Sequence, residues 1–226
     1  MSENINIKRI LTVADALGNL ASTVVFVGGA TLSFYAERPT LEIRPTKDID
    51  ILIELLTYHD YAQLEKEIRP LGFRNDVESG VICRYKLDEV IVDIMPTSGN
   101  ILGFANKWYA TGFKNALAYE ITQTRKIKIL SAPYFVAAKF EAFKSRGRYN
   151  GRTSHDFEDI VYVLENRTSF WDEIKQSSDE IKEYFKVEFG NLLAHKSFTE
   201  WLDCNVERNS PPATNLIIEK MREFLR

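Results

Sequence analysis

The expected fold rests on three stretches of sequence: VVFVGGATL at residues 24–32, DIDILIEL at 48–55 and VIVDIMP at 90–96. Their runs of apolar residues predict buried strands. Side chains alternate between the two faces of a strand, so Asp48 and Asp50 are expected on one face and the isoleucine between them on the other. Asp93 stands among apolar residues in the third stretch. If its strand lies beside that of Asp50, the three carboxylates converge.

Such a group of carboxylates predicts a bound cation. Two unit charges about 4 Å apart repel by roughly 4 kcal/mol at an effective dielectric constant near 20. Acidic side chains in an apolar strand therefore need a partner, unless they mark a solvated strand end. Mg²⁺ prefers carboxylate oxygens and usually leaves positions for substrate phosphates. We predict Asp48, Asp50 and Asp93 as ligands of Mg²⁺.

The glycine pair after the first stretch admits two interpretations. It is a tight turn, or it is a phosphate-binding turn, since glycine lets backbone N–H groups approach a phosphate and a helix start favours negative charge. Hydroxyls just downstream supply further donors. The second interpretation predicts Gly28, Gly29 and Thr31 as nucleotide-binding residues.

The ordered set of VGG, DID and VDI resembles the signature of the nucleotidyltransferase superfamily: a Gly-Gly or Gly-Ser turn, an Asp-x-Asp pair and a third Asp on a later strand. The resemblance implies an α/β (α+β) core with a mixed sheet, and transfer of a nucleoside monophosphate from an NTP to an acceptor hydroxyl by a two-metal mechanism. Asp48 and Asp50 would bridge Mg²⁺ and the triphosphate. Asp93 would hold the catalytic ion and accept the hydroxyl proton. Because Gly29 replaces the frequent Ser, the phosphate contact would come from the backbone or from Thr31.

Periodicity and turn residues predict the order of the elements. Helices are expected over 5–20, 30–36 and 58–69, and strands over 24–27, 48–55, 73–76, 81–87, 90–95 and 127–130. Residues 97–126 give no clear pattern. After Ser131, a capping residue followed by a first-turn proline, the chain becomes helical. We expect a nucleotidyltransferase-like α/β core over residues 1–130 and a helical part over 131–226.

Charged residues recur at helical spacing in that second part. Lys139 and Arg146 fall at i and i+7 on one helix face, and Asp156 and Asp159 fall at i and i+3 on the next helix. From spacing alone, an ion pair between two helices is the favoured interpretation.

The order KFEAFKSR…HDFEDIVYVL resembles the Lys-x-x-Ala-x-x-x-Arg…Asp-x-x-Asp-Leu motif of the AbiEii/AbiGii nucleotidyltransferase toxin family, and GGATLSFY…RPTKDIDI fits that family's upstream run. The resemblance covers residues 24–165. It implies catalytic roles for Lys139 and Asp156, with Lys139 also binding the nucleotide. Two positions depart from the pattern: His155 stands where a basic residue is usual, and the Asp-Leu pair is Asp-Ile here.

The loop between these helices, KSRGRYNGR, is basic. It is a solvated turn, or Arg146, Arg148 and Arg152 bind the phosphates of an anionic acceptor while Tyr149 stacks on a base. By family resemblance, the acceptor is a tRNA 3′ end. The protein would then be the toxin of a bacterial toxin–antitoxin or abortive-infection system, with an antitoxin protein as its partner.

Two rival functions stay open. A small-molecule enzyme of the aminoglycoside nucleotidyltransferase kind would line its cleft with extra acids for a cationic acceptor, which the basic loop opposes. A catalytically inactive nucleotidyltransferase-fold binding module would be favoured by loss of a carboxylate, and all three are present. The sequence identifies neither the NTP nor the acceptor.

Composition sets the remaining expectations. The 226 residues are 45% hydrophobic, which supports a sizeable core, and the net charge of -3 argues against broad, non-specific nucleic-acid binding. No apolar run approaches the roughly 20 residues that span a bilayer, and the first residues lack the layout of a signal peptide. With Cys83 and Cys204 as its only cysteines, we expect a reduced, cytoplasmic protein without a membrane partner.

Overall fold

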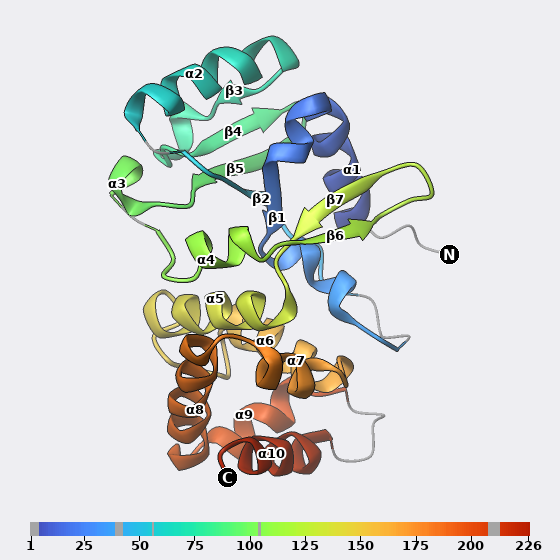
Figure 1. The fold of residues 1–226 in the computed structure, drawn as a ribbon, viewed down its shortest axis with the longest axis vertical. Helices are drawn as coiled ribbons and strands as arrows, with labels where there is room; N and C mark the ends of the chain where they lie inside the picture. The colour runs from blue at the N-terminus through green and yellow to red at the C-terminus, as the bar shows by residue number, and fades with distance from the viewer. Residues whose placement is uncertain (1–4, 39–42, 56, 104, 208–212) are drawn as a thin grey trace. The chain divides into compact units, whose positions relative to one another are not determined.

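The computed structural model describes residues 5–38, 43–55, 57–103, 105–207 and 213–226. They fall into two compact units (Figure 1). One holds the described residues of 1–34 and 42–131, and the other holds those of 35–41 and 132–226. We call them the sheet unit and the helical unit.

The sheet unit is built on seven strands in the order β3-β4-β5-β2-β1-β7-β6 (Figure 1). Their bounds are β1 Val24–Val27, β2 Asp48–Ile53, β3 Arg74–Asn75, β4 Arg84–Leu87, β5 Val90–Pro96, β6 Leu117–Glu120 and β7 Lys126–Ile129. The sheet is mixed: β2 pairs with β5 and β1 with β7 in parallel, and the other neighbours are antiparallel.

The register of the central strands aligns the acidic residues. Asp50 of β2 is level with Asp93 of β5, and Arg84 of β4 is level with Asp93 from the other side. Residues at one level of neighbouring strands project to the same face, so these side chains share a face. The opposite face is apolar, and there Tyr85 is fully buried and donates a hydrogen bond to Glu65 of α2 at 3.0 Å.

Short helices complete the sheet unit. They are α1 Ile5–Leu17, α2 Tyr58–Ile68, α3 Gly99–Leu102 and α4 Tyr109–Lys114, with 3-10 turns η1 Gly18–Thr23, η2 Gly29–Tyr35, η3 Arg69–Leu71 and η4 Val77–Ser79. Helix α2 begins at a capping box between Thr57 and Asp60 and continues into η3, which ends at Gly72, whose φ is 99°. The stretch expected as a helix over 30–36 is the 3-10 turn η2.

The helical unit contains α5 Ala132–Ser145, α6 His155–Asn166, α7 Phe170–Gln176, α8 Asp179–Ala194, α9 Phe198–Asn205 and α10 Ala213–Phe224. Its core is aromatic: the ring centroid of Phe140 lies 6.2 Å from that of Phe185 and 6.1 Å from that of Phe189. Residues 35–38 also belong to this unit, where the backbone N–H of Glu37 donates to the carbonyl of Asn166 at 2.9 Å.

The expected fold class is confirmed: a mixed α/β sheet unit is followed by a helical C-terminal part. Within the described ranges, every helix is too short or too polar to cross a lipid bilayer.

Candidate active site

The predicted acidic residues meet on one face of the sheet. Asp48 and Asp50 lie two residues apart in β2, and Asp50 and Asp93 stand directly opposite each other on parallel strands. Asp93 is buried, and the other two are half-buried. The strand alternation that predicted a shared face therefore holds.

A residue that the sequence analysis did not single out lies between two of these carboxylates. The Arg84 Nε donates to Asp93 Oδ1 at 2.8 Å, and its Nη2 donates to Asp93 Oδ2 at 2.7 Å and to Asp48 Oδ2 at 3.3 Å. The first two bonds form a bidentate arginine–carboxylate pair. These hydrogen bonds to Asp93 raise the pKa of Arg84 above its usual value, against the opposing effect of burial. The guanidinium therefore keeps its positive charge.

The sequence does contain a signal for Arg84. A two-residue turn at 88 and 89 joins β4 to β5, and Leu87 pairs with Val90 across it. Counting back three residues and forward three residues from that pair brings Arg84 opposite Asp93. Hairpin register, set by turn length, would have predicted the ion pair.

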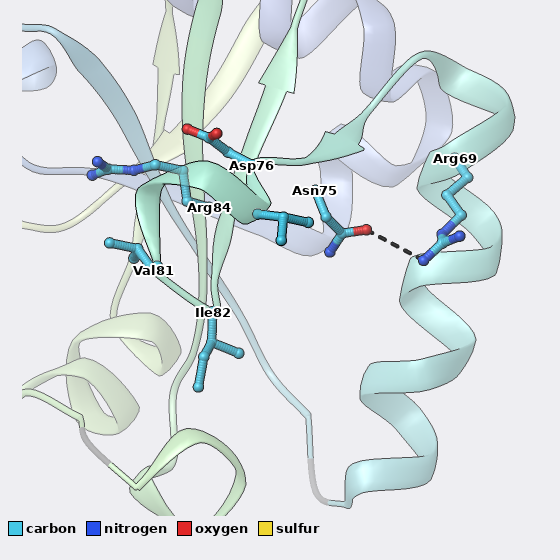
Figure 2. A pocket seen from close by; sticks show the side chains of 8 residues that line it. Arg69, Asn75, Asp76, Val81, Ile82 and Arg84 are labelled. Atoms are coloured by element: carbon cyan, nitrogen blue, oxygen red, sulfur yellow. Dashed lines mark hydrogen bonds between the residues drawn. The ribbon is translucent and has the colours of Figure 1, made fainter.

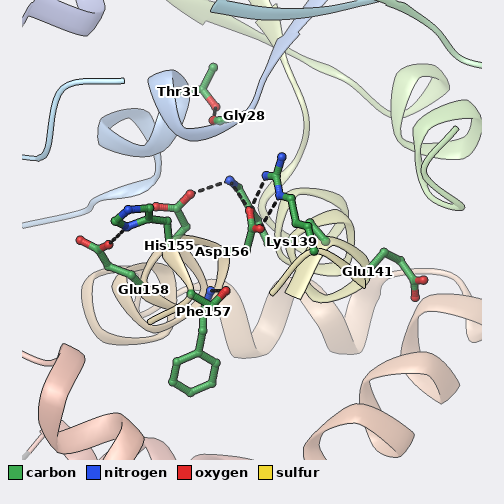
Figure 3. Close-up of polar contacts among 12 residues, drawn as sticks. Gly28, Thr31, Lys139, Glu141, His155, Asp156, Phe157 and Glu158 are labelled. Carbon is green, nitrogen blue, oxygen red and sulfur yellow. Dashed lines mark hydrogen bonds and ion pairs between the residues drawn. The ribbon is translucent and has the colours of Figure 1, made fainter. Parts of the chain in front are cut away.

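Gly28 and Asp50 fit together without space for a side chain. Gly28 has φ 74°, and a Cβ atom added to it would lie 2.0 Å from Asp50 Oδ2. The Thr31 hydroxyl donates to the carbonyl oxygen of Gly28 at 2.9 Å, and its backbone N–H donates to the same oxygen at 3.2 Å (Figure 3). Thr31 is fully buried and closes the turn that Gly29 begins, and its role in nucleotide binding stays a prediction.

The carboxylates of this cluster are the kind of ligand that a hard divalent cation prefers. Mg²⁺ in proteins is commonly held by one or two carboxylates and completes its shell with water and substrate phosphates. The Arg84 Nη2 already lies within hydrogen-bond distance of Asp48 and Asp93, so a single positive group can bridge them. In the part of the chain that the structure describes, no three acidic, histidine or cysteine side chains are arranged to hold a metal ion together. The joint ligation of Mg²⁺ by Asp48, Asp50 and Asp93 stays a prediction, and the oxygens of Asp48 and Asp93 would be available to a cation only once Arg84 has moved.

A pocket of about 440 Å³ adjoins this cluster (Figure 2). That volume is typical of small-ligand sites. The pocket is lined by Arg69, Asn75, Asp76, Val77, Gly80, Val81, Ile82 and Arg84. Arg84 therefore belongs both to the pocket wall and to the carboxylate cluster.

The helical unit holds a second ion cluster (Figure 3). The Lys139 Nζ lies 3.1 Å from Asp156 Oδ1 and 2.5 Å from Asp159 Oδ2. Arg146 adds a bidentate pair, with Nε and Nη2 each 2.7 Å from an Asp156 oxygen. Lys139 and both aspartates are buried. The four side chains comprise two cations and two anions, so their charges balance.

The charges of this cluster support each other. Burial by itself would lower the pKa of Lys139, but the negative charges of Asp159 and Asp156 raise it above its usual value. Burial likewise would raise the pKa of Asp156, but the hydrogen bonds from Arg146 and the charge of Lys139 lower it. Lys139 and Asp156 are brought together, as an ion pair between α5 and α6. Their catalytic roles stay predictions.

The basic loop is largely neutralised within the helical unit. Arg146 pairs with Asp156, and Arg152 pairs with Glu200. Arg148 is exposed, with an unusual positive φ of 49°.

Tyr149, predicted to stack on a base, has φ 51° and a different ring partner. Its ring stacks on that of Phe143, with the centroids 4.8 Å apart. Of the loop residues predicted to bind an acceptor, Arg146 and Arg152 form ion pairs with described acids, and Arg148 is exposed.

Comparison with known proteins supports the fold. No family model matches the chain, and no curated protein matches it. A solved structure similar to it is the crystal structure of an antigenic nucleotidyltransferase-like protein from Paracoccidioides brasiliensis, with a TM-score of 0.54 and 18% sequence identity. The match covers 89% of this chain and 94% of that one. At this identity, the likeness establishes a nucleotidyltransferase-like fold and nothing about activity.

Proposed function

We propose that this chain is a nucleotidyltransferase that transfers a nucleoside monophosphate from an NTP to an acceptor hydroxyl. The observation that carries the proposal is the register of β2 and β5, which sets Asp50 directly opposite Asp93 with Asp48 two residues away. The glycine turn against Asp50 and the nucleotidyltransferase-like fold support it.

Each residue of the cluster has a separate role in the proposed reaction. Asp48 and Asp93 would hold Mg²⁺, which when bound stabilises charge on the phosphates and lowers the pKa of a coordinated hydroxyl. The absent side chain of Gly28 lets the Asp50 carboxylate lie against the turn. Asp93 would also accept the acceptor's proton, as the resemblance to the nucleotidyltransferase superfamily implies.

For the acceptor we propose the 3′ end of a tRNA, and for the biological role a toxin paired with an antitoxin, as the AbiEii/AbiGii resemblance implies. Arg148 is the open cation of the basic loop and the best placed to meet an RNA phosphate. The pocket beside the carboxylates is lined by two arginines, Arg69 and Arg84, and one acid, Asp76, which favours an anionic acceptor over the cationic acceptor of an aminoglycoside-type enzyme.

One observation favours a second candidate, an inactive binding module. Arg84 occupies the space between Asp48 and Asp93 where a cation would act. If the arginine never leaves, the fold binds nucleotides without transferring them.

The test is incubation of the protein with each radiolabelled NTP and total tRNA, with Mg²⁺ and with EDTA. We expect label on RNA from one NTP, only with Mg²⁺, and none from Asp93→Asn. NTP binding without transfer to RNA or to any small acceptor would instead support the binding module.

A further inference from the structure

Arg84 both pairs with the carboxylates and is partly open to solvent, and the proposed transfer reaction gives it no role. It is the positive partner of Asp48 and Asp93, and its side chain is 23% exposed. A divalent cation on Asp48 and Asp93 would use the oxygens that now accept from Arg84. The guanidinium and the ion cannot occupy that space together, because both are positive and need the same atoms.

We propose that Arg84 is an exchangeable counter-cation, which leaves the carboxylates for a substrate phosphate when a divalent cation binds. Metal and nucleotide would then load together. This inference rests on the proposed function for the identity of the anion, a nucleoside triphosphate. The competition between Arg84 and a divalent cation does not depend on transfer.

Charge favours this exchange. Asp48 and Asp93 carry two negative charges between them and Arg84 only one positive charge, whereas a divalent ion would balance both. An arginine released beside a triphosphate gains a planar anionic partner that it can bind in bidentate fashion. Without a nucleotide, a bound metal ion would leave Arg84 beside a dication and without an anionic partner, so metal binding alone is less favourable.

Space also favours it. Arg84 forms part of the wall of the 440 Å³ pocket, which gives its side chain open space into which it could turn. Its neighbour Tyr85 points to the opposite face and anchors the strand on α2. Rotation of the Arg84 side chain would therefore leave β4 in place.

The test is Mn²⁺ binding to the whole protein, measured by electron paramagnetic resonance, for wild type and Arg84→Met. Without nucleotide, we expect Arg84→Met to bind Mn²⁺ more tightly, by about 5–150-fold, the usual range of coupling between two ligands. With a non-hydrolysable NTP analogue, the wild type should gain Mn²⁺ affinity and the variant should gain much less.

The matched control is Lys86→Met. Lys86 lies two residues along the same strand, on the same face, and pairs with Asp76 at 2.9 Å. The Lys86→Met substitution removes one positive charge but leaves Arg84, Asp48 and Asp93 unchanged. The Mn²⁺ affinity of this variant should therefore stay near that of the wild type.

Equal Mn²⁺ affinity of Arg84→Met and wild type without nucleotide would overturn the proposal, and so would an equal gain in Lys86→Met. If Arg84→Met folds poorly, Arg84→Lys keeps the charge but loses the bidentate pair, and it should show a smaller gain of the same sign. Tight Mn²⁺ binding by Arg84→Met without transfer by any variant would uphold the competition and refute the proposed function.

Discussion

The two units carry ion clusters of the same kind that differ in their access to water. In the sheet unit, Arg84 lies between Asp48 and Asp93, and in the helical unit, Lys139 lies between two aspartates of α6. The Arg84 side chain is 23% exposed and that of Lys139 is 9% exposed. Both arrangements place one cation between two carboxylates, and the helical cluster adds Arg146 on Asp156.

Burial decides what each cluster can do. A buried ion pair has lost its hydration, so removing one partner leaves an uncompensated charge in a medium of low polarity. A partly exposed pair can exchange its partner for water, an ion or a substrate at little cost. We therefore expect substitutions in the cluster of α5 and α6 to act first on stability and substitutions in the cluster of β2, β4 and β5 to act first on binding.

The largest effect should follow from Lys139→Met. Asp159 is 0% exposed and would be left buried without its closest cation. We expect a loss of about 3–5 kcal/mol in the free energy of unfolding, measured by urea denaturation. Lys126→Met, at a pair with Glu120 in which both side chains are exposed, should change little. If the Lys139→Met protein is stable but binds NTP weakly, Lys139 binds the nucleotide, and the contrast drawn between the two clusters is wrong.

Gly28→Ala should have the next largest effect. Its Cβ would lie 2.0 Å from Asp50 Oδ2 at a φ of 74°, so both strain and displacement of Asp50 are expected. Backbone strain alone costs about 1–3 kcal/mol. Gly18→Ala is the control, because Gly18 has φ 55° but nothing within 4 Å of an added Cβ. Loss of NTP binding in Gly28→Ala but not in Gly18→Ala would locate the effect at Asp50; equal behaviour would show that only strain matters.

Acid should weaken the buried cluster. The pKa of Asp156 is lowered in the folded protein, because Arg146 and Lys139 outweigh the effect of burial. A depressed carboxyl pKa stabilises the fold above the ordinary pKa of the group, and that stability is lost as the pH falls toward the folded value. The free energy of unfolding should therefore decrease below about pH 4 in urea titrations. Asp156→Asn should show a shallower decrease, and an unchanged slope would contradict this account.

The smallest effect on stability should come from Arg148→Glu. The side chain is exposed, so the free energy of unfolding should change by less than about 0.5 kcal/mol. If RNA is the acceptor, its KM should rise and depend less on salt, because one phosphate contact is lost. Steady-state labelling at several salt concentrations measures both. Arg152→Glu, at a residue that pairs with Glu200, should change KM less, and the reverse order would assign the contact to Arg152.

Much of the sheet unit follows from its sequence. The run at residues 24–27 forms β1 as predicted, and alternation correctly placed Asp48 and Asp50 on one face. The segments that were missed carry weak signals. Strand β6, Leu117–Glu120, is an edge strand whose side chains are mostly exposed, so it has no apolar alternation to detect.

The site was only partly predictable for a different reason. An acidic residue within an apolar strand is unusual enough to be noticed in the sequence, whereas a single arginine such as Arg84 is not. Its importance appears only when hairpin register sets it opposite Asp93. The pairing of Lys139 with Asp156 did follow from helical spacing, but spacing does not reveal burial, and burial is what separates a structural pair from an exchangeable one.

The central claim is that Asp48 and Asp93 bind a divalent cation in exchange for Arg84. Its most direct test is a crystal structure of the protein with Mn²⁺ and a non-hydrolysable NTP analogue, with the ion located by anomalous diffraction. The account predicts an Mn²⁺ peak on both carboxylates and the Arg84 guanidinium on a phosphate. An analogue bound with Arg84 still paired to Asp93, and no Mn²⁺ at the carboxylates, would contradict it.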